Sequence, residues 1–374
     1  MDINKRLLIT LIAVFLLLTG CTDQHIIERA GFVRTIAYDL SGEGADTKLR
    51  VTVSIPKSNH EDAIVYSTMA ESGKKAKMTF DRQNNRRLVN GQLRQVVFGE
   101  RLARRGVWSN MDTLTRDPSI GSRLHIIVSE SDPHHILIRN DYPQGPTAGE
   151  YIDTLIRTEA KAGEIPDTSL YTFTRDYFDD GIDPVATILK EEKESLTVDG
   201  IALFKNDQYV GKIEADDRMF FALLHHGVRA GDLNVGLKSE RDGEEQATLE
   251  YLSSSRKVKV LSTRDIREGK PIQVVLHIKL AGSLLEYIGQ LDMKKRTDQQ
   301  KLEVELEKAV HRKCQELIDS MQEKKSDPMG IGQHVRNSIP HSVWKQLKWE
   351  EVFSKADISV HVDVKIRDYG KMLH

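Results

Sequence analysis

Ile358-Ser359-Val360-His361-Val362-Asp363-Val364-Lys365-Ile366 alternates strictly between aliphatic and polar side chains. This period of two predicts a half-buried strand with its polar residues facing outward. The stretch follows a long predicted helix, residues 298–321, whose apolar residues return every three or four positions. Residues 257–262 and 272–280 are predicted strands before that helix. Strands and helices mix without a regular βαβ rhythm, so the sequence predicts an α+β fold.

A hairpin and a short helix are predicted at the start of the same half of the chain. Residues 199–204 and 209–213 flank a polar turn at Asn206 and Asp207, a pattern typical of hairpins. Asp216 is then the predicted cap of a helix that carries Met219, Phe220, Leu223 and Leu224.

The first half of the chain has a less regular pattern. Residues 31–40 and 49–55 predict strands, and 123–129 predicts a central strand covered on both faces. We expect helices over about 61–105, with an apolar face of Leu93, Val96, Val97, Phe98 and Leu102, and over 147–162, ended by Gly163. Residues 176–197 are charged and irregular. We therefore expect one or two α+β domains in residues 21–197 and a C-terminal α+β domain in 198–374.

The N-terminus has the pattern of a lipoprotein signal peptide. Lys5 and Arg6 precede an apolar stretch at 7–18, and the run Leu18-Thr19-Gly20-Cys21 resembles a lipobox. The stretch is too short to span a bilayer, which takes about 20 apolar residues. We expect residues 1–20 to be removed and a diacylglyceryl group to be attached to Cys21; an ordinary secretory signal with a chance cysteine is the alternative.

Composition limits the remaining chain. Removing residues 1–20 leaves 52 basic and 55 acidic side chains, so the net charge gives no reason to expect a nucleic-acid partner. The mature 354 residues exceed what one hydrophobic core usually supports, which favours two or three domains. Cys314 is the other cysteine, and acylation of Cys21 leaves it without a disulfide partner.

Motifs for catalysis, metal binding or nucleotide binding are missing from the sequence. Gly330 and Gly332 begin like a dinucleotide fingerprint but lack the third glycine, so we interpret them as a turn. Adjacent histidines rarely share one ion, and His311 with Cys314 lacks a third ligand. We therefore predict no enzyme activity, no metal site and no cofactor other than the lipid. The adjacent histidines are His134, His135, His225 and His226.

One segment is strongly basic. Between residues 70 and 105, ten basic side chains face three acidic ones. On a lipid-tethered protein this segment could contact anionic head groups or an acidic partner; a solvated helical face paired with carboxylates is the plainer interpretation. The candidate docking residues are Lys74, Lys75, Lys77, Arg82, Arg86, Arg87, Arg101, Arg104 and Arg105, and Arg94 lies in the same segment.

Taken together, these segments resemble the Ger(x)C family, the C-subunit lipoproteins of GerA-type spore germinant receptors. The family usually has Cys-Trp-Asp at the anchor, and Thr22 departs from that pattern. The residues that carry the resemblance are Cys21-Thr22-Asp23, Ile26, Ile27, Glu28, Gly31-Phe32-Val33, Gly99 through Gly106, Leu114 through Pro118, Gly200 through Phe204, Tyr209-Val210-Gly211, Asp327-Pro328, Gly330, Gly332, Pro340 and Trp344-Lys345.

The resemblance implies a fold of three mixed α/β domains and a role without catalysis. It implies a subunit tethered to the outer face of the spore inner membrane, in complex with integral membrane subunits A and B, that takes part in nutrient-triggered germination. From the residues alone, two other classes stay open. A solute-binding lipoprotein of a transporter would show two related α/β lobes, and a tethered hydrolase would need a nucleophile or metal motif.

Overall fold

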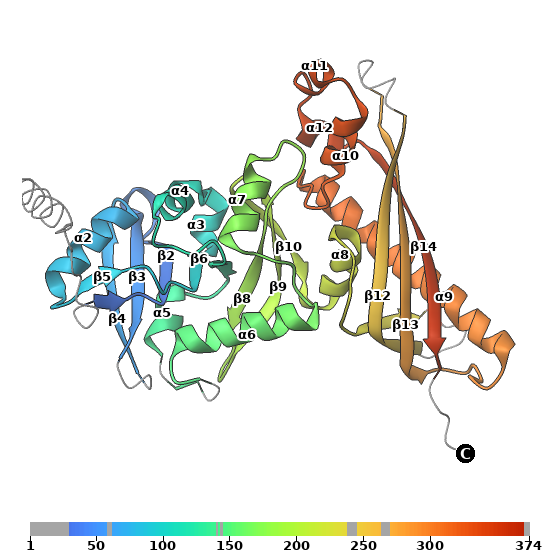
Figure 1. Ribbon diagram of the computed structural model, residues 1–374, viewed down its shortest axis with the longest axis horizontal. Coiled ribbons are helices and arrows are strands. Elements are labelled where there is room, and N and C mark those ends of the chain that lie inside the picture. The colour runs from blue at the N-terminus through green and yellow to red at the C-terminus, as the bar shows by residue number, and fades with distance from the viewer. Residues whose placement is uncertain are drawn as a thin grey trace, which may run out of the picture.

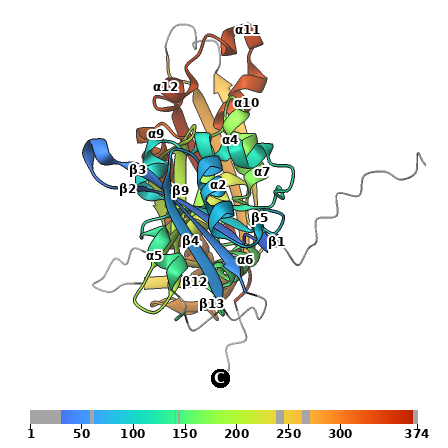
Figure 2. The same ribbon diagram turned by 90° about the vertical axis from the view of Figure 1, so that its left-hand side faces the viewer.

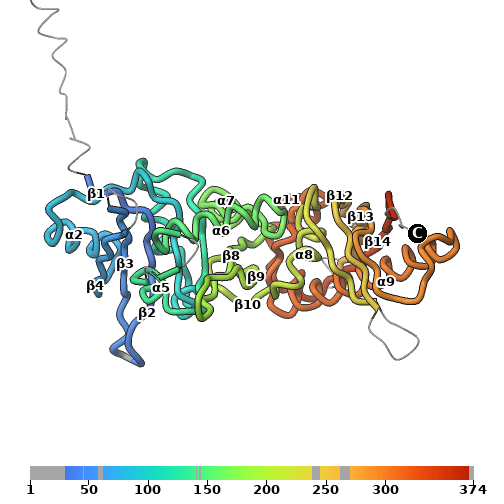
Figure 3. The backbone as a smooth tube through the Cα atoms, turned by 90° about the horizontal axis from the view of Figure 1, so that it is seen from below, coloured from blue at the N-terminus to red at the C-terminus, as the bar shows by residue number. Residues whose placement is uncertain are grey.

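The computed structural model describes residues 30–57, 62–139, 141–142, 145–237, 245–262 and 270–369. The molecule is elongated, and the chain progresses along the long axis from its N-terminal to its C-terminal part (Figures 1 and 3). Two sheets dominate it: a large mixed sheet in the first half and a four-stranded sheet in the second. The predicted multi-domain α+β class is confirmed.

The large sheet has eight strands, and its central strands are parallel. β2 pairs with β6, β6 with β7 and β7 with β8 in parallel, whereas the strands at both edges are antiparallel. In spatial order the strands are β10 (Gln208–Glu214), β9 (Leu196–Lys205), β8 (Val185–Glu191), β7 (His125–Ser129), β6 (Gln95–Gly99), β2 (Thr35–Ser41), β3 (Lys48–Pro56) and β4 (Ala63–Ala70).

Helices cover both faces of this sheet, which explains why its central strands are apolar on both sides. Phe98 and Val128 contribute to the core under one layer of helices, and Val97 and Ile127 to the core under the other. The first layer comprises α2 (Gly73–Gln83), α3 (Glu100–Arg105), α4 (Trp108–Arg116) and α7 (Leu170–Phe178); the second comprises α5 (Pro133–Ile138) and α6 (Ala148–Ala162). Figure 2 shows the end of this unit that carries β3 and β4.

The prediction of a helix over about 61–105 is wrong. The segment contains β4, α2, β5 (Arg87–Val89), β6 and α3 instead. The apolar run at 96–98 is a strand whose successive side chains enter opposite cores, and a short apolar run of this kind cannot be assigned by periodicity alone. The prediction that 176–197 is irregular is also wrong in part, because this segment contains β8. With β6 and β8 both unpredicted as strands, the parallel crossovers from β6 to β7 and from β7 to β8 are not predicted either.

Other elements of the first half follow the sequence closely. α6 begins after Thr147, whose hydroxyl accepts a hydrogen bond from the Glu150 amide at 3.3 Å, and it ends at Gly163. The strand predicted over 31–40 is interrupted, because β1 (Ala30–Phe32) pairs with β5 while β2 joins the large sheet. The 49–55 and 123–129 strands are confirmed as β3 and β7.

The expected division between residues 197 and 198 falls inside β9. β9 pairs with β8 on one side and with β10 on the other, so the sheet is continuous across this point. The predicted β9–β10 hairpin is confirmed, with Asn206 in the left-handed conformation at its turn (φ 54°). The assignment of residues 21–197 and 198–374 to separate domains stays a prediction.

The second sheet packs one face against a 28-residue helix, α9 (Arg296–Glu323). Buried residues along α9 include Leu302, Leu306, Val310 and Cys314, which confirms the predicted apolar stripe. In spatial order the strands are β11 (Leu233–Leu237), β12 (Glu245–Ser262), β13 (Gln273–Ile288) and β14 (Asp357–Asp368).

β14 confirms the opening prediction. Ile358, Val360, Val364 and Ile366 are buried, whereas His361 and the other polar residues lie on the outer face or are only partly covered. The strand pairs with β13 in parallel, and α9 provides the crossover between the two. Three short helices lie between α9 and β14: α10 (Ile331–Ser338), α11 (His341–Trp344) and α12 (Trp349–Phe353).

The large sheet with its helices forms one unit, and the four-stranded sheet with α9 forms the other. α8 (Arg218–His225) lies between these two units, and it carries the apolar residues that the sequence predicted. Its cap is not Asp216. Residues Ala215–Asp217 form a short 3-10 helix, and Asp217 occupies the cap position without a side-chain hydrogen bond.

Candidate functional site

Cys21 and the whole predicted signal peptide lie outside the described residues, so acylation stays a prediction. None of the helices in the described part of the chain has the length and apolar character needed to cross a membrane.

The predicted basic residues separate into two groups. Four lie on α2, Arg86 lies in the turn that follows it and Arg87 begins β5, at the end of the molecule where the described chain begins (Figure 1). Arg101, Arg104 and Arg105 lie on α3, nearer the middle, where the Arg104 guanidinium stacks on the Tyr209 ring at 4.6 Å. Arg94 precedes β6. We call the first group the basic tip; it consists of Lys74, Lys75, Lys77, Arg82, Arg86 and Arg87.

Part of this charge is neutralised locally. Lys75 pairs with Glu71 and Lys77 with Asp81, each at 2.8 Å. Arg104 pairs with Glu100 at 2.6 Å. Within the described residues, the other four members of the basic tip have no ion-pair partner and are exposed. The structure therefore concentrates free positive charge at the tip more than on α3.

A buried carboxylate joins the two halves of the chain. Asp327 is 1% exposed. Its oxygens accept hydrogen bonds from the Ile331 amide at 3.1 Å, the Gly332 amide at 2.8 Å and the Trp349 indole at 3.0 Å. Burial raises the pKa of Asp327 to about 7. Asp327 thus holds the start of α10 against α12.

Asp183 attaches this cluster to the large sheet. Its carboxylate accepts from the Asp327 amide at 2.8 Å and from the Asn206 amide, in the β9–β10 turn, at 3.0 Å. The Asp183 amide donates in return to the Asp327 carbonyl at 2.9 Å. Ser326, which is fully buried, donates to the Phe204 carbonyl at 2.6 Å. The loop before β8 and the end of β9 are therefore hydrogen-bonded to the segment after α9.

The backbones make close contact at the same place. A Cβ atom on Gly332 would lie 2.6 Å from the Trp349 indole nitrogen and 2.7 Å from the Gly181 Cα. Asp179 pairs with Arg336 at 2.7 Å and accepts from Gln333 at 2.9 Å. We call this set of contacts around Asp327 the junction.

Arg256 extends the junction to α8. Its guanidinium donates to the carbonyls of Leu224 and His225 at the end of α8, and to the Met329 carbonyl at 2.8 Å. A cation at the carboxyl end of a helix is favoured by the free carbonyls there. β12, α8 and the segment before α10 are thereby held together by one side chain.

The two adjacent histidine pairs and His311 lie at separate places in the fold. No group of three or more His, Cys, Asp or Glu side chains in the described ranges is arranged to hold an ion. Burial lowers the pKa of His225 to about 3, so this ring is neutral. His311 interacts with the Val360 carbonyl at 2.9 Å. Cys314 is a free, buried thiol whose pKa burial raises to about 12.

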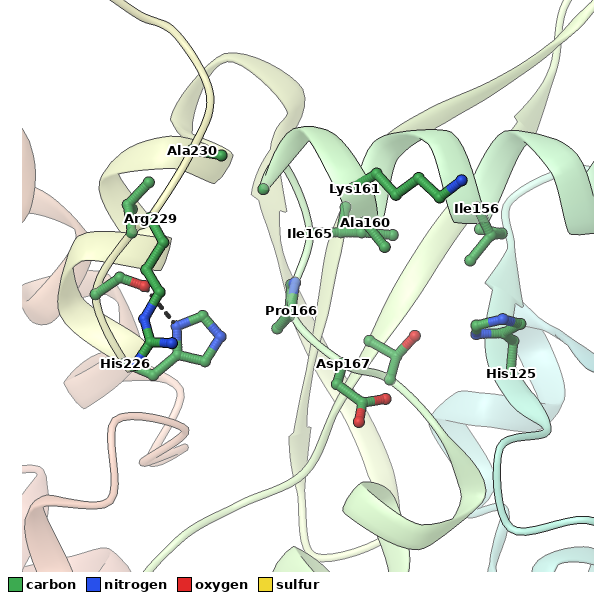
Figure 4. A pocket seen from close by; sticks show the side chains of 14 residues that line it. His125, Ile156, Ala160, Lys161, Ile165, Pro166, Asp167, His226, Arg229 and Ala230 are labelled. Atoms are coloured by element: carbon green, nitrogen blue, oxygen red, sulfur yellow. Dashed lines mark hydrogen bonds between the residues drawn. The ribbon is translucent and has the colours of Figure 1, made fainter. Parts of the chain in front are cut away.

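A cavity of about 600 Å³ lies between the two units. One wall is formed by α6 and the segment around Asp167, and the other by residues 226–230 after α8 (Figure 4). Arg229 and His226 lie on one side and His125 on the other. Basic and acidic groups are mixed here.

Sequence reasoning missed several of these residues. Asp183 and Arg256 had no local pattern to distinguish them from other charged residues. Asp327, Gly330 and Gly332 were noticed, but only as a turn and as part of a resemblance. The spacing Asp-Pro-x-Gly-x-Gly, which leads into α10, is the signal that could have indicated a carboxylate accepting from helix amides.

These features define a multi-domain α+β protein whose two unlike units are joined through a buried polar junction. Comparisons with known proteins give the class more closely. Residues 23–191 match the family model described as the spore germination protein N-terminal domain, and residues 199–370 match the one described as spore germination B3/GerAC like, C-terminal. The chain belongs to the Ger(x)C family of spore germination proteins.

Individual relatives cover almost the whole chain. Spore germination protein GerQC of Bacillus cereus is 25% identical, with 98% of this chain and 99% of that protein covered. Spore germination protein B3 of Bacillus subtilis is 23% identical, with 96% of each covered. The crystal structure of the GerBC protein has the same fold, with a TM-score of 0.54 and 16% identity over 89% of this chain and 97% of that one. The family is not a known enzyme family.

Proposed function

We propose that this chain is the lipid-anchored C subunit of a nutrient germinant receptor, held at the outer face of the spore inner membrane, where it docks with integral membrane subunits A and B. The observation that carries the proposal is the run Leu18-Thr19-Gly20-Cys21, placed directly before a region that matches the family from residue 23 onward. Two acyl chains on one cysteine anchor a protein stably, where a single chain is marginal.

The basic tip lies where an anchored chain would bring it to the membrane. In the pairing of β1 with β5, Ala30 lies opposite Arg87. Nine residues lead from Cys21 to Ala30, and even fully extended they span at most about 30 Å. The tip is therefore within reach of the head groups. Each basic residue near an anionic surface contributes about 1 kcal/mol, screened within a Debye length.

Tethering also favours docking with membrane partners. A lipid anchor confines the protein to the membrane surface, which raises its effective concentration near other membrane proteins. Weak contacts are then enough for it to dock with them. The arginines on α3, away from the tip, are candidates for contact with a protein partner. Because the junction links the two units by hydrogen bonds, we expect them to dock together with a membrane partner.

The test replaces the anchor residue. We expect a Cys21→Ala chain to carry no diacylglyceryl lipid and to leave the membrane fraction. Fewer polytopic membrane subunits should be recovered with it through a C-terminal affinity tag, and nutrient-triggered germination should weaken. Cys314→Ala is the matched control, because it changes the other cysteine at a buried site and leaves the lipobox intact.

Outcomes of this experiment are distinct for each alternative. Recovery with a permease and its ATPase would favour the solute-binding alternative. A Cys21→Ala chain that incorporates lipid label, stays with its partners and supports full germination would contradict the proposal.

A further inference from the structure

A second cavity, of about 430 Å³, lies between the large sheet and helices α2 and α4. It does not overlap the junction. Most of its wall consists of apolar side chains from β2, β3, α2, β5 and α4, which makes it suited to a hydrocarbon body. The apolar lining residues are Val33, Ile36, Val51, Val53, Phe80, Leu88, Leu114 and Ile120.

Tyr38 brings a hydroxyl group to this wall. Tyr38 lines the cavity, is 3% exposed and stacks on Phe98 with ring centroids 5.7 Å apart. Its hydroxyl makes no hydrogen bond to any described residue. Burial raises the pKa of Tyr38, so the hydroxyl keeps its proton and can donate. A ligand oxygen in the cavity would give this hydroxyl an acceptor.

The amino end of α2 lies beside this hydroxyl. A Cβ on Gly73 would be 2.8 Å from the Tyr38 oxygen. Ser72 caps the helix by accepting from the Lys75 amide at 3.2 Å, while the amides of Gly73 and Lys74 find no acceptor in the described structure. Free amides and the helix dipole make this end favourable for an anion.

Lys74 adds a full positive charge. It lines the cavity and is exposed, and it has no ion-pair partner among the described residues. By contrast, Lys77 and Arg116 also line the cavity, but Lys77 is paired with Asp81 and Arg116 with Asp112. Asp117 lines the cavity as well, which disfavours a second anionic group on the ligand. The wall therefore offers a place for one negative charge and a larger apolar region.

We propose that this cavity binds a monocarboxylic acid with an apolar body. The carboxylate accepts from the Tyr38 hydroxyl and pairs with Lys74 at the first turn of α2. The hydrocarbon part fills the space between Phe80, Leu88 and Leu114. The proposal is independent of lipid anchoring at Cys21, because all the lining residues lie at or after Val33.

The test measures binding of radiolabelled hexanoate to the purified full-length chain by equilibrium dialysis, with empty detergent micelles as the partition blank. We expect saturable binding at one site. Tyr38→Phe keeps the ring and its packing, and it should weaken binding at least about tenfold, because a hydrogen bond to a charged acceptor is lost. Lys74→Gln should weaken binding several-fold. Lys75→Gln, one residue away but outside the cavity, is the control and should bind normally.

Two competitors identify what is recognised. Hexanol should compete poorly, since it lacks the carboxylate. If leucine competes and its competition depends on Tyr38, the carboxylate site is supported and the bound ligand is an apolar amino acid rather than a fatty acid. Absence of saturable binding, equal competition by hexanol, or unchanged binding in both the Tyr38 and Lys74 variants would overturn the proposal. Lys74 is exposed, so its variant decides the matter if Tyr38→Phe does not fold.

Discussion

Replacing Asp327 by asparagine should change how the stability of the protein depends on pH. The substitution keeps the size of the side chain but removes the ionisable group at the centre of the junction. One of the three N–H donors, on Ile331, Gly332 or Trp349, then loses its acceptor, because an amide presents a single oxygen. A buried donor left unpaired costs about 1–3 kcal/mol, so at pH 5 we expect the variant to be less stable than the natural chain.

The size of the pH effect follows from the raised pKa. An ordinary aspartate titrates at about 3.9, whereas burial raises the pKa of Asp327 to about 7. Between these values the folded chain holds a proton that the unfolded chain has released, so the free energy of unfolding falls as pH rises. Integrating this difference from pH 5 to pH 8 gives a loss of about 3 kcal/mol. The Asp327→Asn variant cannot show this loss, because asparagine does not titrate.

Urea unfolding at pH 5 and pH 8, followed by tryptophan fluorescence, measures this difference. Trp344 and Trp349 lie at the junction with their rings 5.5 Å apart. The variant should be less stable at pH 5, and the gap should close or reverse at pH 8. Asp363→Asn, at an exposed position on β14, is the control and should follow the natural chain. Equal pH dependence of the unfolding free energy in the natural chain and in Asp327→Asn would show that Asp327 does not have a raised pKa.

Three further predictions concern packing, reactivity and the membrane. Gly332→Ala should lower the free energy of unfolding by about 1–3 kcal/mol through overpacking, while Gly121→Ala, where a Cβ meets nothing within 4 Å, should leave it nearly unchanged; equal thermal melts would contradict the close contact. Cys314 should resist iodoacetamide at pH 8 until urea unfolds the chain, because its thiol is buried and its pKa is raised to about 12; rapid labelling of the folded protein would count against this. Replacing the arginines of the basic tip by glutamine should weaken sedimentation with anionic vesicles at low salt; unchanged binding and unchanged recovery of the receptor complex would remove the tip from the account.

The sequence predicted best where one face of an element is buried and the other is not. β14, α9 and α6 each show a clear period, and their bounds were close to those observed. β6 lies in the middle of the large sheet, and helices cover both its faces, so its residues carry no alternation. The sequence therefore predicts a helix there and, with β8 also unpredicted, does not predict the parallel order of the central strands.

The candidate sites were predicted unevenly for a related reason. The basic residues were identified as a group, but a linear count could not show that α2 and α3 carry them to different places. The junction depends on contacts between residues more than 140 positions apart, such as Asp183 and Asp327. Tyr38 was not noticed, because the lack of a partner is visible only in three dimensions.

Mass spectrometry of the mature N-terminus measures directly whether Cys21 is the first residue and carries the lipid. We expect a chain that begins at Cys21 and carries a diacylglyceryl group on the sulfur of that residue. A mature chain that begins elsewhere, or a Cys21 without lipid, would contradict the proposed lipid anchoring.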